Sequence, residues 1–558
     1  MPKLAIPLIL QIKFFSMNVD FNRNEDLMKR SVSQLNQKLQ QVYLGGGKKA
    51  IEKQKEKNKL TARERIEYLR DPNTPFTEIA ALAGWEMYED VGGCPSGGTV
   101  AGIGYIRGRQ CMIIANDQTV KAGAWFPITG KKNLRLQEIA MENNLPVIYL
   151  VDSAGVFLPM QDEIFPDKEH FGRIFRNNAR MSAMGIPQIA VVLGACVAGG
   201  AYLPIMSDET IMVEGAGSIY LAGPYLVRAA IGEDVDAETL GGAVTHTEIS
   251  GIADYKFKTE HECLDQVKKL VSKMGSPASA GFNRSDSVEP TKPVSELYGV
   301  MPVDGSKPYD MLDVIERIVD NSSFDQFKQD YGKTILCGYA RIDGWAVGIV
   351  ANQRKIVKSR KGEMQMGGVI YNDSADKSAR FIMTCNQKKI PLIFLQDVTG
   401  FMVGSRSEQS GIIKDGAKMV NAVANSVVPK ITIIIGNSYG AGNYAMCGKA
   451  YDPRFIFAWP SARIAVMGGE QAAKTLLQIQ VAGMKSKGKE VSAEEEKQLF
   501  ENIRGRYETQ TSPYYAAARL WVDGIIDPAD TRNIIAEALY AANQNPVIPE
   551  FKTGVIQV

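Results

Sequence analysis

The chain repeats itself, and this duplication constrains the fold more than any other feature of its 558 residues. The segment LPVIYLVDSAG (145–155) matches IPLIFLQDVTG (390–400), at an offset of 245 residues. Further along, IPQIAVVLGACVAGGAY (186–202) matches VPKITIIIGNSYGAGNY (428–444), at an offset of 242 residues. Repetition at nearly constant spacing and in the same order marks a duplicated unit. We therefore predict two related domains of about 250 residues, close to the size at which single cores stop growing.

The expected domain boundaries follow from a change in composition between the two copies. The stretch KMGSPASAGFNRSDSVEPTKPVSE (273–296) is rich in Pro, Ser and Gly, which is typical of a linker. We divide the chain into an N-terminal extension (1–30), a first domain (31–285) and a second domain (286–558). The extension begins with MPKLAIPLILQIKFFS, whose apolar part is too short to span a membrane, and we interpret Met17 as the natural start.

Each copy alternates predicted strands with predicted helices. A helix is expected at 131–144 in the first copy and at 374–389 in the second, and each precedes a buried-looking strand that ends in Asp-x-x-Gly. Alternation of this kind is typical of parallel strands joined by crossover helices, so the predicted fold class is α/β with βα repeats. In such sheets ligands bind at the carboxyl ends of the strands, where both copies place glycine-rich turns.

Composition excludes several classes of function. A formal net charge of +2, with acidic and basic residues interleaved, indicates no nucleic-acid partner, and we expect no membrane-spanning segment. The seven cysteines are scattered without a C-x-x-C pair and only three histidines occur, so no metal site is predicted. Single cysteines in a large core favour reduced thiols. We expect a cytoplasmic protein, or one of the mitochondrial matrix in a eukaryotic cell.

The turn after the second copy's apolar strand has the sequence motif of a serine hydrolase. Gly436-Asn437-Ser438-Tyr439-Gly440 reads G-x-S-x-G, the pattern of a nucleophile elbow. The first copy has Cys196 in place of Ser438, and no histidine follows His261 in the chain, although the hydrolase order puts the triad histidine after the serine. The hydrolase interpretation is therefore disfavoured.

Both copies share a turn that is poor in side chains and is expected to open a helix. Backbone N–H groups at such a turn can stabilise an oxyanion or an enolate. The alternative is that the glycines only permit close packing of helix against strand. A matched pair of turns favours the interpretation as two oxyanion sites.

At this point the sequence resembles a known family. Residues 45–66, 149–202, 438–473 and the closing 523–532 are similar to the carboxyltransferase β subunit of biotin-dependent acyl-CoA carboxylases. The long segment LPMQDEIFPDKEHFGRIF and SYGAGNYAMCG look most like the 3-methylcrotonyl-CoA carboxylase branch. Arg176 stands where an aromatic or aliphatic residue is more usual in that branch. The resemblance implies two tandem crotonase-type (ClpP/crotonase-like) domains, the first on the acyl-CoA side and the second on the biotin side.

The resemblance also implies a reaction and a set of residues for it. A carboxyl group would pass from carboxybiotin to an acyl-CoA through an enolate, with 3-methylcrotonyl-CoA the expected substrate. The amides of Gly199 and Gly200 would hold the thioester enolate, and those of Ala441 and Gly442 the ureido oxygen of biotin. The wider binding set is Ala198, Gly199, Gly200, Gly440, Ala441, Gly442 and Tyr444.

The biotin attachment signature is missing from the chain, so the family implies a separate partner. That partner would be a biotin carboxylase/biotin carrier α subunit, while the β subunits would form a homo-oligomer, a hexamer. The active site would lie between the first half of one protomer and the second half of another. The alternatives that stay open are a propionyl-, geranyl- or longer-chain substrate, a glutaconyl-CoA-type decarboxylase subunit, and a non-catalytic scaffold.

Other residues admit two interpretations each. Asp152 and Asp397 end equivalent strands, where capping of the following turn is favoured over catalysis. The lysine-rich lead-in at 48–59 could contact CoA phosphates, but its glutamates favour a solvated helix face. His246 is expected to be structural, and Phe171 and Phe401 are candidates for the acyl pocket or for the core.

Overall fold

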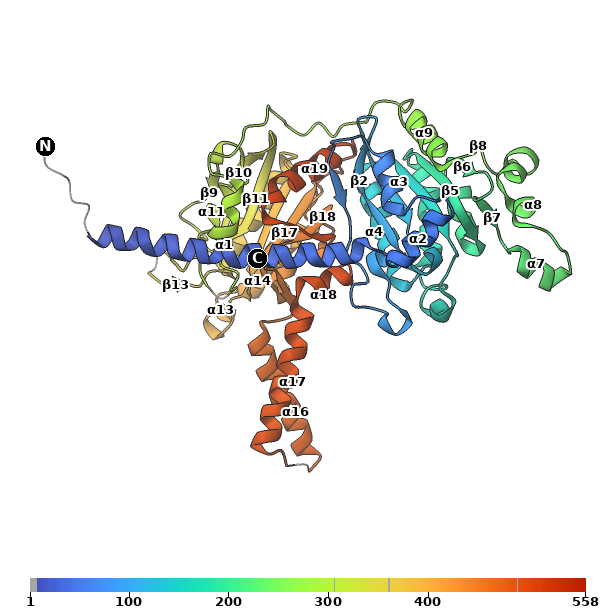
Figure 1. Ribbon diagram of the computed structural model, residues 1–558. Coiled ribbons are helices and arrows are strands. Elements are labelled where there is room, and N and C mark those ends of the chain that lie inside the picture. Colours follow the sequence, from blue (N-terminus) through green and yellow to red (C-terminus); the bar gives the residue numbers. More distant parts are fainter. Residues whose placement is uncertain (1–7, 306, 360–361, 489) are drawn as a thin grey trace.

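The computed structural model describes residues 8–305, 307–359, 362–488 and 490–558, and it contains two sheets of eight strands each. Figure 1 shows these as two bodies side by side, the first copy in blue to green and the second in yellow to red. The first sheet comprises β1 (Phe76–Glu78), β2 (Thr99–Ile106), β3 (Arg109–Asn116), β4 (Val147–Ser153), β5 (Gln188–Val197), β6 (Glu209–Val213), β7 (Ser218–Tyr220) and β8 (Tyr255–Phe257). The second comprises β9 (Asp325–Phe327), β10 (Ile335–Ile342), β11 (Trp345–Asn352), β15 (Leu392–Val398), β17 (Lys430–Tyr439), β18 (Phe455–Ala458), β19 (Arg463–Ala465) and β20 (Gly524–Ile525).

The two sheets have the same topology. The first runs β8-β6-β5-β4-β3-β2-β1 and the second β20-β18-β17-β15-β11-β10-β9, with β7 and β19 pairing the central strands β5 and β17. The four strands from β3 to β6 are parallel neighbours, and so are β11, β15, β17 and β18. The predicted duplication and the predicted α/β fold with parallel strands are therefore confirmed.

Helices cover the sheets and join the parallel strands. The helices of the first half are α1 (Leu8–Tyr43), α2 (Lys48–Glu56), α3 (Ala62–Leu69), α4 (Pro127–Asn143), α5 (Phe171–Ala183), α6 (Tyr202–Ile205), α7 (Pro224–Ile231), α8 (Ala237–Gly241) and α9 (Glu260–Val271). Those of the second half are α10 (Leu297–Val300), α11 (Met311–Ile315), α12 (Asn372–Gln387), α13 (Ser405–Gln409), α14 (Ile412–Ala424), α15 (Gly440–Ala445), α16 (Gly469–Ser486), α17 (Ala493–Thr511), α18 (Pro513–Ala518) and α19 (Thr531–Asn543). The expected helices at 131–144 and 374–389 are α4 and α12.

Short strand pairs lie outside the two main sheets, in the loops of the second domain. They are β12 (Val357–Lys358) with β13 (Met364–Gln365), and β14 (Val369–Ile370) with β16 (Gly400–Phe401).

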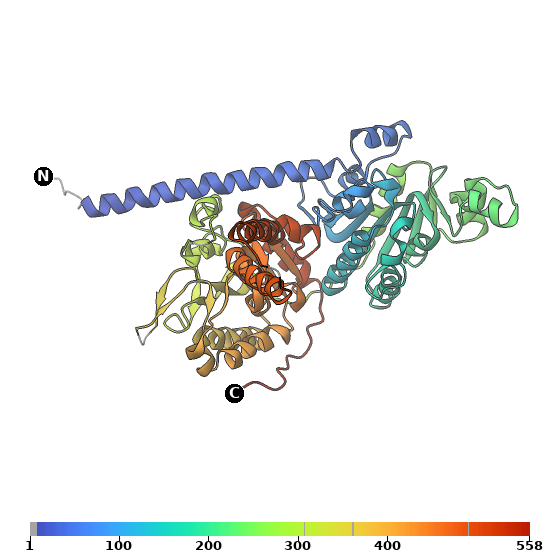
Figure 2. The ribbon, with the colours of Figure 1, turned by 90° about the horizontal axis from the view of Figure 1, so that it is seen from below.

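The first helix belongs with the second body in space. Figure 2 shows α1 lying across the second domain, and a hydrogen bond agrees with this view, because Nδ2 of Asn24 donates to the carbonyl of Gly299 in α10 at 3.2 Å. Met28, Val32 and Leu35 on this helix are buried. The boundary expected at residue 30 thus falls inside one continuous helix. Residues 1–7 of the apolar start lie outside the described residues, and no helix within the described ones is long and apolar enough to cross a membrane.

A buried polar network joins the two domains. Nε and Nη2 of Arg135 on α4 donate to the Asp523 carboxylate at 2.9 and 2.8 Å, and Lys449 reaches the same carboxylate at 2.8 Å. The pKa of Asp523 is lowered, because the attraction of Arg135 and Lys449 outweighs the burial that would raise it. An unpaired charge at a buried position would be costly, so this network fixes the position of α4 against the second domain.

Candidate functional site

The two predicted glycine turns occupy equivalent places in the two sheets. The strand β5 ends at Val197 and β17 ends at Tyr439, and a helical turn follows each of them. Directly before these strand ends, Ser153 pairs with Cys196 and Val398 pairs with Ser438, in both cases just after a register irregularity. The carboxyl ends of both central strands therefore have the same local structure, which is an irregularity in register followed by a helical turn.

The first residue of each turn has left-handed backbone geometry. Ala198 has φ of 56° and its counterpart Gly440 has φ of 53°. A glycine adopts this conformation freely, whereas an alanine pays a steric cost there of about 1 kcal/mol. The first copy keeps the turn in spite of that cost, which indicates that the shape of the turn matters in both copies.

Space around the turns is restricted at two of the four candidate residues. A Cβ atom on Gly199 would lie 2.8 Å from Cε1 of Phe171, and one on Gly442 would lie 2.6 Å from Cγ2 of Val398. A Cβ on Gly200 would meet nothing within 4 Å, and Ala441 is exposed. Each turn is thus packed tightly against its own domain on one side and is open on the other.

Large side chains flank both turns. Tyr202 and Tyr444 follow the turns at equivalent positions, and they are 49% and 48% exposed. Phe171 packs edge-on against Trp125 and Phe175, with ring centroids 5.1 and 5.0 Å apart, so it forms an aromatic wall beside the first turn. Phe401 lies against Gly416 of α14 and belongs to the second domain's core packing.

Ser438 is not placed as a nucleophile. Its side chain is fully buried, donates to Oε1 of Gln396 at 2.6 Å and accepts a hydrogen bond from Asn443 Nδ2 at 2.7 Å. Both the donor and an acceptor site of the hydroxyl are occupied by protein groups. In the first copy, burial raises the pKa of Cys196 to about 12, so this thiol is unreactive as well.

Asp152 anchors a buried charge cluster beneath the first turn. Its Oδ2 lies 2.5 Å from Nζ of Lys59 and 3.1 Å from Nη2 of Arg65, and Arg65 also contacts Glu260 at 2.7 Å. Lys59 ends the lysine-rich lead-in, so this lysine of the segment is buried rather than solvated. The sequence signal for the cluster was the recurrence of the Asp residue at equivalent strand ends.

Asp397 has the equivalent place in the second copy but different partners. It accepts hydrogen bonds from the backbone N–H of Asn437 at 2.9 Å and from the Tyr309 hydroxyl at 2.9 Å, and Arg354 lies 3.4 Å away. Burial raises its pKa although Arg354 acts in the opposite direction. Gly194 and Gly436 leave the space that each carboxylate fills, since a Cβ there would lie 1.9 and 2.4 Å from carboxylate atoms. The two aspartates hold strand ends together.

His246 has a structural role. His246 contacts the Ser250 hydroxyl at 2.8 Å and the Ile219 carbonyl at 2.7 Å, as expected for a structural histidine. Within the described part of the chain, no cluster of His, Cys, Asp and Glu could hold a metal ion.

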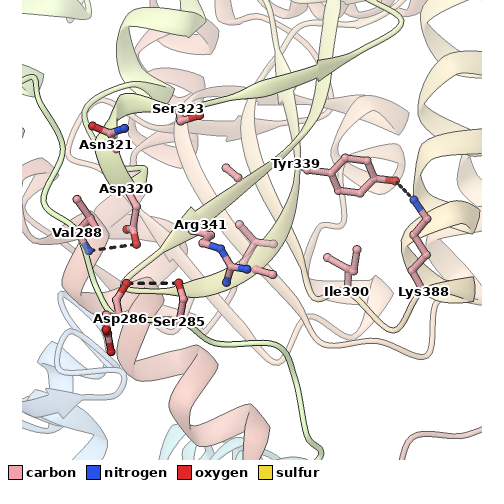
Figure 3. Close-up of a pocket in the computed structure, with 13 residues that line it drawn as sticks. Ser285, Asp286, Val288, Asp320, Asn321, Ser323, Tyr339, Arg341, Lys388 and Ile390 are labelled. Carbon is pink, nitrogen blue, oxygen red and sulfur yellow. Dashed lines mark hydrogen bonds between the residues drawn. The ribbon is translucent and has the colours of Figure 1, made fainter.

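The hollow drawn in Figure 3 is lined by no residue of the two glycine turns. It has a volume of about 500 Å³ and is enclosed by the linker at Ser285 and Asp286, by Tyr339 and Arg341 on β10, and by Lys388. Lys388 donates to the Tyr339 hydroxyl at 3.3 Å and Arg341 donates to the Gly344 carbonyl at 2.6 Å. Because Lys388 and Arg341 already donate hydrogen bonds to protein groups, we interpret this hollow as the space left where the linker packs over the sheet, and not as a binding site.

Comparison with known proteins identifies the class to which this fold and these paired turns belong. The carboxyl transferase domain family matches residues 53–556, and the chain belongs to that family. The resemblance to carboxyltransferase β subunits of biotin-dependent acyl-CoA carboxylases is thereby confirmed.

Individual relatives are similar over nearly the whole chain. The mitochondrial methylcrotonoyl-CoA carboxylase β chain of Dictyostelium discoideum is 49% identical over 95% of this chain and 88% of its own length. The biotin-dependent 3-methylcrotonyl-coenzyme A carboxylase β1 subunit of Mycobacterium tuberculosis is 50% identical over 94% of this chain and 96% of its own. The crystal structure of the geranyl-CoA carboxylase β subunit of P. aeruginosa superposes with a TM-score of 0.84 at 39% identity, covering 96% of this chain and 98% of that one. This likeness confirms the predicted tandem crotonase-type fold.

Proposed function

We propose that this chain transfers a carboxyl group between biotin, carried by a partner protein, and 3-methylcrotonyl-CoA. The observation that carries the proposal is the matched pair of side-chain-poor turns at the ends of β5 and β17, in a chain about 50% identical to methylcrotonoyl-CoA carboxylase β chains. Two reactants each develop negative charge on an oxygen in this reaction, and two matched turns can serve one oxygen each.

The first domain takes the acyl-CoA in this proposal. The amides of Gly199 and Gly200 donate to the thioester oxygen as the enolate forms, and Ala198 sets the left-handed turn that directs them. Phe171 closes one side of this turn and excludes water from the reacting carbon. These groups bind and orient the acyl-CoA, and no side-chain base is required of the chain.

The second domain takes the biotin. The amides of Ala441 and Gly442 donate to the ureido oxygen, Gly440 sets the turn, and the exposed Tyr444 ring borders it. The open side of the turn fits a flat, uncharged ring with a carbonyl oxygen, since no side chain covers Ala441. Biotin, when bound, supplies the carboxyl group and accepts the proton of the acyl-CoA.

In this proposal the chain divides between residues 285 and 286 into an acyl-CoA domain and a biotin domain. The proposal also includes a partner subunit and an oligomer of β subunits. The partner is a biotin carboxylase/biotin carrier α subunit. A hexamer of β subunits pairs the first domain of one copy with the second domain of another, and exposed apolar side chains beside both turns, among them Ile205 and Val466, support such pairing. The expected location is the cytoplasm or, in a eukaryotic cell, the mitochondrial matrix, and the mitochondrial relative from Dictyostelium supports the second of these for a eukaryotic source.

A transfer assay across substrates tests the proposal. We expect transfer to biotin from the carboxylated form of 3-methylcrotonyl-CoA to exceed transfer from the carboxylated propionyl and geranyl esters by at least tenfold in kcat/KM. A preference for the geranyl or propionyl ester would show that 3-methylcrotonyl-CoA is not the substrate, while the proposed carboxyl transfer would still hold. The decarboxylase alternative has a relative at 35% identity, a methylmalonyl-CoA decarboxylase subunit of Propionigenium modestum, and co-purification with an ATP-dependent biotin carboxylase would exclude it.

A further inference from the structure

A groove rich in arginine runs along α4 and α5, and no residue of the two glycine turns lines it. Its volume is about 580 Å³, within the range typical of small-ligand sites. The lining residues are Lys131, Leu134, Arg135, Glu138, Met141, Glu169, Arg173, Arg176, Asn177, Arg180, Lys449 and Leu520. The last two come from the second domain, so the groove lies where the two domains meet.

The positive charges of the groove outnumber the negative ones. Arg135 forms ion pairs with Asp523 and with Glu138, Lys449 pairs with the same Asp523, and Arg173 lies 3.6 Å from Glu169. In contrast, Arg176 and Arg180 form no ion pair with any residue that the structure describes. Six basic side chains, against the carboxylates of Glu138, Glu169 and Asp523, leave three positive charges in excess.

The three arginines of α5 are arranged as a row, and two of them, Arg176 and Arg180, are the unpaired ones. Arg173, Arg176 and Arg180 are spaced by three and four residues on α5, so they project from one face of the helix. Like charges at this spacing destabilise a helix, and an anion between them would remove the repulsion. At the opposite wall, Lys131 donates to the Arg519 carbonyl at 2.8 Å, and burial together with the Arg519 charge lowers its pKa. Both walls are therefore short of negative charge.

The shape and chemistry of the groove define the class of ligand. Guanidinium groups bind phosphate oxygens in a bidentate manner, and two of them one helical turn apart can hold a diphosphate. Leu134, Met141 and Leu520 supply an apolar surface suited to a planar base. We propose that this groove binds the phosphate groups of an adenine nucleotide, held by Arg176 and Arg180.

The nucleotide has two possible sources, a free adenine nucleotide or the nucleotide portion of the CoA ester. Only the second source depends on the proposed function. Phe171, which touches the first glycine turn, begins α5, and Arg180 lies nine residues further along, or about 14 Å at 1.5 Å per residue. An extended CoA ester spans that distance, so both sources are compatible with the geometry.

Titration calorimetry on the full chain tests the proposal with inorganic pyrophosphate, ADP, adenosine 3′,5′-bisphosphate and adenosine as probes. We expect the phosphates to bind and adenosine to bind at least tenfold more weakly. The double variant Arg176→Ala/Arg180→Ala should weaken phosphate binding by tenfold or more, and Arg176→Lys/Arg180→Lys should restore part of it. Arg228→Ala is the matched control, because Arg228 is an exposed arginine on α7. Unchanged melting temperatures would show that the variants fold.

The same variants separate the two sources. If the CoA ester supplies the nucleotide, the double variant raises KM for acyl-CoA at least tenfold and leaves kcat within about twofold. If a free nucleotide occupies the groove, KM stays unchanged while ADP binding is lost. The proposal is overturned if no phosphate probe binds, if binding persists in the double variant, or if only an acidic peptide such as decaglutamate binds. Calorimetry requires no turnover. The phosphate-binding result could therefore be interpreted even if the carboxyltransferase assay showed no activity.

Discussion

The Ser438 hydroxyl donates a 2.6 Å hydrogen bond to Oε1 of Gln396, and this contact connects the second glycine turn to the neighbouring strand. Gln396 Nε2 in turn donates to the carbonyl of Met446 at 2.7 Å, just beyond the end of α15, while Asn443 within α15 donates to Ser438. The three side chains thus tie both ends of the helix that opens at the proposed biotin turn to strand β15. The serine of the G-x-S-x-G spelling positions this helix.

Replacement of Ser438 should slow the reaction without abolishing it. In Ser438→Ala the buried Gln396 and the half-buried Asn443 lose a partner, which costs about 1–3 kcal/mol of unfolding free energy. We expect kcat to fall about tenfold, KM for acyl-CoA to stay nearly constant, and Ser438→Thr to recover activity if the added methyl is accommodated. Steady-state kinetics and melting temperatures measure these effects. Complete inactivation together with fluorophosphonate labelling of Ser438 in the wild type would revive the hydrolase interpretation.

Added bulk at Gly442 should disturb the second turn directly. The new Cβ in Gly442→Ala would lie 2.6 Å from Val398, so the turn or the valine must move. Loss of one well-placed oxyanion donor costs about 10²–10³ in kcat, and we expect a fall of that order. Gly483→Ala on α16, where a Cβ meets nothing within 4 Å, is the matched control. Partial rescue in Gly442→Ala/Val398→Ala would confirm the steric cause, and wild-type rates in Gly442→Ala would contradict the assigned role.

Relief of strain at Ala198 should stabilise the first domain. Ala198 has φ of 56°, and glycine at this position removes the steric cost while it adds entropy to the unfolded chain. We expect Ala198→Gly to raise the unfolding free energy by about 0.5–1 kcal/mol, and Ala198→Val, a β-branched residue, to lower it. Thermal unfolding monitored by circular dichroism gives both values. A lower melting temperature for Ala198→Gly would show that the alanine methyl contributes packing that outweighs its strain.

Glu142 should make stability depend on pH near neutrality. This residue lies in the last turn of α4, beside Arg454 at the domain interface, and burial raises its pKa from 4.5 to about 7, although Arg135 and Arg454 oppose the change. Its Oε2 lacks a hydrogen-bond partner among the described residues. Between these pH values the folded chain holds a proton that the unfolded chain releases, so the free energy of unfolding falls as pH rises from about 4.5 to 7.

Denaturant unfolding at pH 5, 6, 7 and 8 measures this dependence. We expect Glu142→Gln, which cannot ionise, to lose the part of the slope due to this group and to exceed the wild type above pH 7 by about 1–3 kcal/mol. Glu138→Gln is the control, since Glu138 is a neighbour on the exposed side of α4 that pairs with Arg135. Equal slopes in wild type and Glu142→Gln would assign the pH dependence to another group.

Much of the fold was readable in the sequence because the information is local. The alternation of apolar strands and helices, the small residues of the turns at 198–200 and 440–442, and the order of the repeats are properties of contiguous segments. Duplication then supplied an internal comparison. Because the first copy has Cys196 at the position equivalent to Ser438, the sequence already argued against Ser438 as a nucleophile. These signals suffice to predict two domains of one topology and the places where their strands end.

The pairing of distant side chains was decided only by the tertiary structure. Nothing near Arg65 in the sequence indicates that it meets Glu260, 195 residues later, nor that α1 packs on the second domain rather than on the first. The raised pKa of Glu142 and the row of arginines on α5 likewise depend on which surfaces are buried and which charges face them. Periodicity determines which side of a helix or strand is apolar, but the partner of each buried charge is fixed only when the two domains pack together.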